Sequence, residues 1–228
     1  MVDNIYCINL ERSSQRRESA LQEFEREGLD VEFFRATDGK VEAPSGIYIS
    51  KPEWGCADSH IRVWRDIVAN GYETALVFED DISLVPDFNY KLEQIISELP
   101  PNWDYVNLGA SDAWRIDVKK VSKTVYTGQA LLAHGYLIRL DCAKKWSTFD
   151  STHLKTAIDI LMTYFPTHNL QITDPIVIQK GSTLSTISNN FNGRSIDYTL
   201  LIKQWGRFIV FLLTLTVLLY IFRKQILG

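Results

Sequence analysis

The segment over residues 74–81 constrains the fold most, because an apolar run of strand length ends there in three consecutive carboxylates. Residues 74–78 read TALVF, and Glu79, Asp80 and Asp81 follow at once. Short apolar runs of this kind are typical of strands covered on both faces of a sheet. Ligands of open α/β sheets bind beyond the carboxyl ends of such strands. The segment therefore predicts a layered α/β domain with a polar site at this strand end.

Similar apolar runs alternate with helical patterns along the 228 residues. Further strands are expected within residues 4–10, 31–35, 103–108, 129–139 and 172–179, and helices within 12–28, 57–69, 87–99, 143–146 and 153–164. This alternation predicts an α/β fold with a mostly parallel central sheet covered by helices.

The C-terminal region differs in character from the rest of the chain. Residues 208–222 read FIVFLLTLTVLLYIF, carry no charge, and lie between Arg207 and the pair Arg223 and Lys224. A helix of about 15 residues spans roughly 22 Å, which is short of the ~30 Å hydrocarbon core. We expect a membrane anchor over 208–223, with a buried core helix as the alternative.

The expected organisation is a catalytic domain over residues 1–195, a linker over 196–207 and the anchor. The N-terminus lacks the apolar region of a signal peptide. The catalytic domain is therefore expected on the cytosolic side of a membrane, held by its C-terminal tail.

Charge and cysteine usage narrow the function classes. The net charge is −4 and no basic stripe occurs, so nucleic acid is not an expected partner. Three cysteines lie far apart without a CxxC pair, which indicates neither a zinc motif nor a disulfide framework. They are interpreted as small, partly buried thiols.

The acidic segment suggests a cation site. Side chains alternate along a strand, so Glu79 and Asp81 are expected on one side and Asp80 on the other. No cationic residue lies in the segment, and a divalent cation would relieve the repulsion between the two carboxylates. Oxygen ligands suit Mg²⁺ or Mn²⁺, which would also neutralise a diphosphate leaving group. A solvated acidic turn is the alternative.

Residues 54–60 (WGCADSH) form a second candidate site. With a helix starting near residue 57, Ser59 and His60 are expected on its first turn, where backbone N–H groups favour an anion or polar ligand. A purely structural role for His60 competes with this interpretation.

Residues 9–17 (NLERSSQRR) form a third. Asn9 follows a strand, and Arg12 and Arg16 open a helix, where they could bind a nucleotide phosphate or base. A solvated, charged helix face is the alternative.

Taken in order, these segments resemble glycosyltransferase family 25, which includes lipopolysaccharide-core and procollagen galactosyltransferases. The resemblance covers roughly residues 4–190 and lies in residues 8–12 with Arg16, 36–39 (ATDG), 53–60, 78–81 (FEDD), 103–109 (WDYVNLG), 135–138 (GYLI), Asp159 and 175–179 (PIVIQ). The segment between 39 and 53 is short for the family, and the C-terminal apolar run is not a usual family feature.

The resemblance implies a GT-A fold, a nucleotide-sugar donor such as UDP-galactose or UDP-glucose, and inversion at the anomeric carbon. The acceptor would be a glycan, a lipopolysaccharide-type saccharide or a hydroxylysine. Donor contacts are expected from Asn9, Arg12, Arg16, Asp38, Ser59, His60, Asp80 and Gln179.

An inverting displacement needs a base for the acceptor hydroxyl. Asp159 is the first candidate, because it interrupts the apolar run over 157–161, and apolar neighbours raise a carboxyl pKa. Asp112 is the reserve. A non-catalytic sugar-nucleotide-binding scaffold is the main alternative function. A nucleotidyltransferase is disfavoured because no Gly-rich phosphate loop with a lysine occurs.

Overall fold

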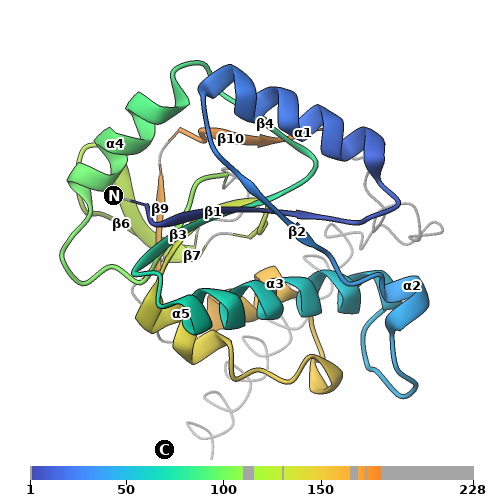
Figure 1. The fold of residues 1–228 in the computed structure, drawn as a ribbon. Helices are drawn as coiled ribbons and strands as arrows, with labels where there is room; N and C mark the ends of the chain where they lie inside the picture. Colours follow the sequence, from blue (N-terminus) through green and yellow to red (C-terminus); the bar gives the residue numbers. More distant parts are fainter. Residues whose placement is uncertain (1, 110–115, 130, 165–168, 173, 181–228) are drawn as a thin grey trace, which may run out of the picture. The chain divides into compact units, whose positions relative to one another are not determined.

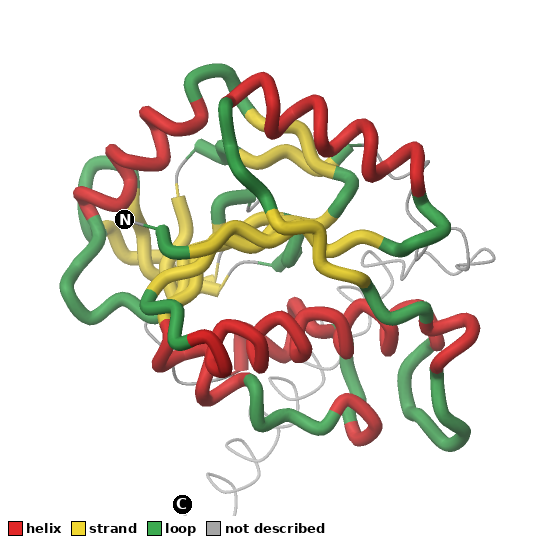
Figure 2. Tube along the Cα trace, in the orientation of Figure 1, coloured by secondary structure: helices red, strands yellow, loops and turns green. Residues whose placement is uncertain are grey.

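The computed structural model describes residues 2–109, 116–129, 131–164, 169–172 and 174–180, all within one compact unit of the chain, Met1–Thr186. A central sheet lies between two groups of helices (Figures 1 and 2). Its eight strands are ordered β2-β1-β3-β8-β5-β9-β7-β6, and a small second sheet joins β4 to β10.

The strands of the central sheet are β1 (Asn4–Asn9), β2 (Glu32–Arg35), β3 (Thr74–Glu79), β5 (Tyr105–Asn107), β6 (Ile116–Lys120), β7 (Val125–Gln129), β8 (Gly135–Arg139) and β9 (Asn169–Ile172). The second sheet consists of β4 (Ile82–Leu84) and β10 (Val177–Gln179). The helices are α1 (Ser14–Glu27), α2 (Gly39–Glu42), α3 (Lys51–Asn70), α4 (Phe88–Glu98), α5 (Leu140–Trp146) and α6 (Ile158–Tyr164), with a short 3-10 helix, η2 (Ser151–His153).

The central sheet is mixed, so the prediction of a mostly parallel sheet holds for β2, β1 and β3 but is wrong for most strand pairings beyond β3. Strand β1 pairs in parallel with β2 and β3, and β5 pairs in parallel with β9. Strand β8 runs antiparallel to β3 and β5, and β7 runs antiparallel to β6 and β9. The link between β6 and β7 is a short turn, and a turn of that length can join only antiparallel strands.

Alternation along the strands builds a core on each face of the sheet. In β3, Ala75 and Val77 pack with Trp64 of α3, whereas Leu76 and Phe78 pack with Phe24 of α1 on the opposite face. All six are buried, and burying each large side chain is worth about 1.5–3 kcal/mol. Two-sided burial holds β3 in place, and with it the acidic residues at its end.

Helix α3 begins earlier than expected. It starts at Lys51 rather than at residue 57, because Ser50 and Glu53 form a capping box and Pro52 occupies the first turn. Gly71 ends the helix in the left-handed conformation. Ser59 and His60 therefore lie in the middle of the helix, and the argument that placed them at a helix N-terminus is wrong.

The structure does not support the predicted location at a membrane. Across the described part of the chain, no helix has both the length and the apolar character that crossing a bilayer requires. The longest of these helices, α3, is charged at Asp58, Arg62 and Arg65. The expected anchor over 208–223 and linker over 196–207 fall outside the described residues.

Candidate functional site

The carboxyl ends of β1 and β3 meet at one edge of the sheet. The two strands are parallel neighbours, with Ile8 opposite Glu79. Asn9, the last residue of β1, donates from Nδ2 to Oδ2 of Asp80 across 2.7 Å. This register brings the acidic segment against the start of α1.

Arg16, in the first turn of α1, binds both aspartates that follow β3. Its Nη1 lies 3.0 Å from Oδ1 of Asp80, and its Nη2 pairs with Oδ2 of Asp81. Both aspartates are buried. The segment over residues 74–81 itself carries no cationic residue, and the cation that pairs with its aspartates comes from a distant segment.

The acidic residues divide differently from the predicted alternation. Strand β3 ends at Glu79, so the strand period does not extend to Asp80 and Asp81. Asp80 and Asp81 share Arg16, whereas Glu79 contacts Cys56 and His60. Glu79 and Asp81 still act on one another electrostatically, since the Glu79 charge contributes to the raised pKa of Asp81.

Negative charge exceeds positive charge in this cluster. Burial raises the pKa of Asp81, the Glu79 charge raises it further, and Arg16 only partly offsets both. Burial also raises the pKa of Asp80. Burial alone would raise the pKa of Glu79, but the hydrogen bond and charge of His60 outweigh it and lower that pKa.

One oxygen of this cluster has no hydrogen-bond partner. Among the described residues, no group donates to Oδ1 of Asp81, although this atom is buried. An unpartnered, buried carboxylate oxygen in a site with excess negative charge fits a divalent cation. The residues present thus suit the cation that the sequence predicted.

Strand β10 brings Gln179 to the same edge. Gln179 lies opposite Ile82 in the small sheet, and its Nε2 lies 3.4 Å from Oδ2 of Asp81. The backbone N–H of Lys180 donates to the carbonyl of Asp81 across 2.6 Å. Gln179 and Lys180, which lie late in the chain, therefore both contact the acidic cluster.

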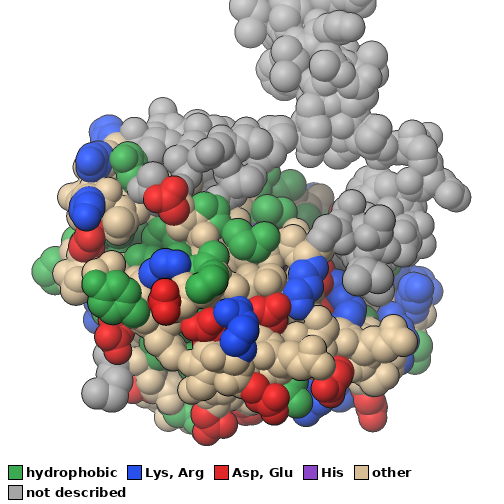
Figure 3. Space-filling model, turned by 90° about the horizontal axis from the view of Figure 1, so that it is seen from above, with side chains coloured by type: hydrophobic (Ala, Val, Ile, Leu, Met, Phe, Trp, Pro, Cys, Tyr) green, Lys and Arg blue, Asp and Glu red, His purple; other side chains and the backbone are tan. Residues whose placement is uncertain are grey.

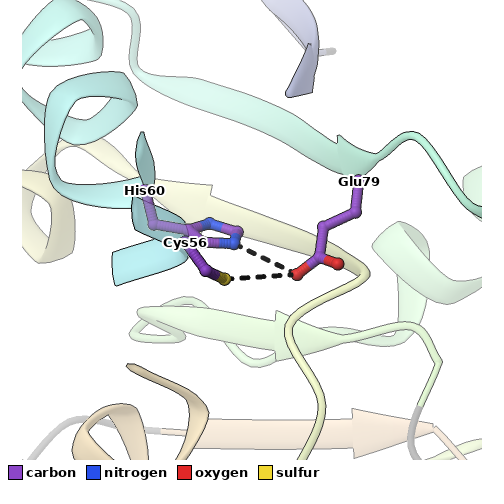
Figure 4. A group of neighbouring side chains, drawn as sticks. All are labelled: Cys56, His60 and Glu79. Atoms are coloured by element: carbon purple, nitrogen blue, oxygen red, sulfur yellow. Dashed lines mark hydrogen bonds and ion pairs between the residues drawn. The ribbon is translucent and has the colours of Figure 1, made fainter. Parts of the chain in front are cut away.

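Glu79 lies at the centre of a second cluster (Figure 4). His60 Nε2 is 3.4 Å and Cys56 Sγ is 3.9 Å from Oε1 of Glu79. On the other side of the ring, His60 Nδ1 lies 2.9 Å from the hydroxyl of Tyr136, which also accepts a hydrogen bond from Trp64 Nε1 at 3.0 Å. The ligating atoms of Cys56, His60 and Glu79 all lie within 4.8 Å of one another.

An open pocket of about 340 Å³ lies beyond the ends of β1 and β2. Its lining includes Leu10, Arg12, Ala36 and Asp38. Arg12 pairs with Asp38, and Asp38 also caps α2 by accepting from the N–H of Lys40. The pocket therefore presents a partly exposed cation and a carboxylate beside an apolar wall.

Ser59 joins helix α3 to the wall of this pocket. Its hydroxyl accepts from the N–H of Thr37 at 2.8 Å and donates to the carbonyl of Gly55 at 2.6 Å. Ser59 is almost fully buried. In this structure it supports the turn that carries Asp38.

Asp159, at the start of α6, hydrogen-bonds to a strained backbone bend at Leu132. Its Oδ2 accepts from the N–H of Leu132 at 3.2 Å, and Leu132 has a left-handed φ of 77°. Asn107 donates to the carbonyl of the same residue at 2.7 Å. Strained conformations of non-glycine residues cluster at functional sites. Asp112 lies outside the described residues.

Comparison with known proteins identifies the family. Residues 2–162 match the family model described as glycosyltransferase family 25 (LPS biosynthesis protein). The chain belongs to glycosyltransferase family 25. Its acidic segment and its Cys56–His60 helix both lie within the matched residues, so these clusters are part of the family domain.

Relatives of this family 25 chain are longer proteins. A glycosyltransferase 25 family member of Aedes aegypti is 35% identical over 167 residues, which cover 63% of this chain and 28% of the relative. Procollagen galactosyltransferase 1 of Danio rerio is 26% identical over 219 residues, which cover 77% of this chain and 36% of the relative. The chain thus spans about a third of the length of these relatives.

A solved structure supports the fold. The glycosyltransferase involved in glycosylation of the major capsid of PBCV-1 aligns with a TM-score of 0.51 at 10% identity, over 77% of this chain and 92% of that chain. At this identity the likeness shows the fold alone. The fold of the family 25 chain is a GT-A-like α/β fold, as the resemblance implied.

The structure brings most predicted residues of this family 25 chain into two neighbouring places. Asn9, Arg16, Asp80, Asp81 and Gln179 form the acidic cluster, and Arg12 and Asp38 line the adjoining pocket. Sequence reasoning treated Cys56 as an ordinary, partly buried thiol and missed its contact with Glu79. The signal was available, since Cys56 and His60 are one helical turn apart.

Proposed function

We propose that the chain transfers a hexose, galactose or glucose, from a UDP-sugar to a saccharide or hydroxylysine acceptor with inversion at the anomeric carbon. The observation that carries the proposal is the acidic cluster at the end of β3, with its unpartnered Asp81 oxygen, beside the pocket lined by Arg12 and Asp38. This arrangement provides places for a cation, a diphosphate and a nucleoside at one sheet edge.

The pocket suits the nucleoside of the donor. Arg12 can pair with a phosphate oxygen, and the Asp38 carboxylate can accept hydrogen bonds from ribose hydroxyls. Asn9 and Arg16 both bind the carboxylate of Asp80 and hold it in position. Ser59 holds the turn that carries Asp38.

Glu79 and Asp81 would hold the Mg²⁺ or Mn²⁺ ion. When bound, such an ion supplies charge neutralisation at the leaving diphosphate. Arg16 balances part of the charge on the two aspartates and leaves the Glu79 carboxylate and the free oxygen of Asp81 for the ion.

Asp159 is the proposed base. In a single displacement, the acceptor oxygen forms a bond to the anomeric carbon while the bond to the UDP oxygen breaks, and the acceptor proton passes to a carboxylate. Burial and the Glu79 charge are the main causes of the raised pKa of the Cys56 thiol, and the Asp159 charge is the next. Asp159 therefore lies near the Glu79 cluster. Asp112 is the second candidate.

The nature of the acceptor rests on the family and its relatives. The family description names lipopolysaccharide biosynthesis, and the zebrafish relative is named for procollagen. A saccharide acceptor and a hydroxylysine acceptor both present a hydroxyl group to the same base, so the chemistry is common to both.

The decisive experiment is a donor-hydrolysis screen with UDP, GDP and CMP sugars, with and without Mn²⁺. We expect hydrolysis of a UDP-hexose that depends on the cation, and a loss of roughly a hundredfold or more in Asp81→Asn, since electrostatic stabilisation of a leaving group is worth several kcal/mol. Asp141→Asn, at an exposed position of α5, is the matched control. Full activity in EDTA would exclude the metal role, and no turnover with any donor would favour a non-catalytic scaffold.

A further inference from the structure

The cluster around Glu79 has the composition of a metal site of a different kind from the acidic cluster. We propose that Cys56, His60 and Glu79 form a three-ligand site for a thiophilic divalent cation such as Zn²⁺. The inference concerns binding alone and does not rest on the proposed sugar transfer, although the site shares the carboxylate of Glu79 with the Mg²⁺ or Mn²⁺ site proposed above.

The spacing of the three ligands supports the site. Cys56 and His60 lie one turn apart in α3, and both point toward Glu79 at the end of β3 (Figure 4). A tetrahedral zinc ion with Zn–N and Zn–O bonds of about 2.1 Å separates its nitrogen and oxygen ligands by about 3.4 Å. The observed distance between His60 Nε2 and Glu79 Oε1 is 3.4 Å.

The same distance is long for a hydrogen bond. N–H···O bonds in proteins usually join donor and acceptor atoms across about 2.7–3.2 Å. The separation of Cys56 Sγ from Glu79 Oε1, 3.9 Å, exceeds the roughly 3.6 Å sulfur–oxygen edge of a zinc tetrahedron by a few tenths of an ångström. A small side-chain adjustment closes that difference.

The environment of His60 orients its ring for coordination. The ring is fully buried, and the hydroxyl oxygen of Tyr136 lies 2.9 Å from Nδ1. Histidines that bind metals through one nitrogen usually donate the other N–H to an oxygen. Tyr136 can accept that proton while also accepting from Trp64, which leaves the Nε2 lone pair directed at Glu79.

Charge balance also favours a divalent ion. On binding, the Cys56 thiol releases its proton to solvent, as does His60 Nε2 if it carries one, and His60 coordinates as a neutral imidazole that keeps its proton on Nδ1. The thiolate and the Glu79 carboxylate then match the two positive charges, so the buried site carries no net charge. Three protein ligands leave a fourth tetrahedral position for water or a substrate oxygen.

The test uses Co²⁺ as a spectroscopic substitute for Zn²⁺. The full chain, freed of metal with EDTA and desalted, is titrated with Co²⁺ while its near-ultraviolet and visible absorption are recorded. We expect one equivalent to produce a thiolate-to-cobalt charge-transfer band and the intense visible bands of a tetrahedral ion. Tyr136→Phe should weaken binding by about 10–100-fold, since it removes the partner of the ligating ring.

Cys56→Ala should abolish the charge-transfer band, whereas Cys142→Ala, which removes another buried thiol in α5, should keep it. Circular dichroism establishes that each variant is folded, and Cys56→Ser replaces Cys56→Ala if the latter unfolds. The proposal is overturned if the parent chain shows no charge-transfer band, or if the band persists in either Cys56 variant. Loss of the band with intact sugar transfer, or the reverse, separates this site from the proposed function.

Discussion

The Nη1 atom of Arg16, in the first turn of α1, lies 3.0 Å from the Oδ1 atom of Asp80, which follows β3. The same guanidinium also binds Asp81, and its side chain is only 17% exposed. A single cation from another element thus pairs with two buried carboxylates and offsets part of their charge. The edge of the sheet where we place the donor is therefore held together by charge as well as by apolar packing.

Arg16→Ala should destabilise the fold by on the order of 3 kcal/mol, because it leaves two buried carboxylates without their partner. Urea unfolding at neutral pH measures the change. Arg16→Lys is the matched control: it keeps the charge but loses the two-pronged geometry, so its loss should be smaller. Equal stability of the alanine variant and the parent would mean that the pair contributes nothing to folding.

The packing of Gly55 against the turn before α2 leads to a second prediction. A Cβ atom at Gly55 would lie 2.6 Å from the backbone N of Gly39 and 2.7 Å from the carbonyl oxygen of Thr37. Alanine in the middle of a helix normally stabilises by about 0.5–1 kcal/mol over glycine. Here Gly55→Ala should instead cost about 1–3 kcal/mol, because backbone atoms cannot yield to the new methyl group.

Gly55→Ala should also weaken UDP binding, because moving this turn displaces Asp38 from the pocket. Thermal unfolding and calorimetric titration with UDP measure the two effects. A stabilised variant with parental UDP affinity would show that α3 and the turn are not packed as described.

Asp159→Asn should reduce turnover by about 10²–10⁴-fold and leave the Kd of the UDP-sugar unchanged, since a base matters for the chemical step. Calorimetry and a transfer assay give the two quantities. Because the carboxylate of Asp159 also accepts from the N–H of Leu132, the melting temperature must be followed alongside. Lost donor binding or a lost fold would assign Asp159 to support of the bend, and Asp112 would be tested next.

Local sequence signals predicted much of the site. The strand that ends at Glu79 and the helix that carries Arg16 follow from apolar runs and helix-ending residues. The single late strand expected within 172–179 is instead the end of β9 and a separate strand, β10, which carries Gln179. Parallel pairing of β1 and β3 then brings Asn9 to Asp80 without further information.

The errors came from contacts between distant segments and from one missed helix cap. No pattern near β3 indicates that Arg16 would pair with Asp80 and Asp81, or that His60 would contact Glu79. The antiparallel direction of β8 depends on its neighbours and not on its own residues. The capping box of Ser50 and Glu53 was visible in the sequence but was not used, so the helix was expected to begin near residue 57.

The last prediction concerns Glu23, which joins α1 to the small sheet. Its carboxylate accepts from the N–H of Leu84 at 3.1 Å and from the hydroxyl of Ser83 at 3.0 Å, and it pairs with Arg26 and Lys180. Burial alone would raise the pKa of Glu23, but these donors outweigh burial and lower it to about 2.

A lowered pKa means that the Glu23 carboxylate stabilises the folded chain above its unfolded pKa of about 4.3, and that this contribution is lost as pH falls toward 2. Glu23→Gln should therefore cost about 1–2 kcal/mol at pH 7, and its difference from the parent should shrink steadily below pH 4. Chemical denaturation across a pH series measures this difference. Glu25→Gln, at an exposed position of the same helix, is the matched control and should have the stability of the parent at pH 7. If the difference between the Glu23 variant and the parent stayed constant down to pH 2, the hydrogen bonds of Glu23 would not depend on its charge.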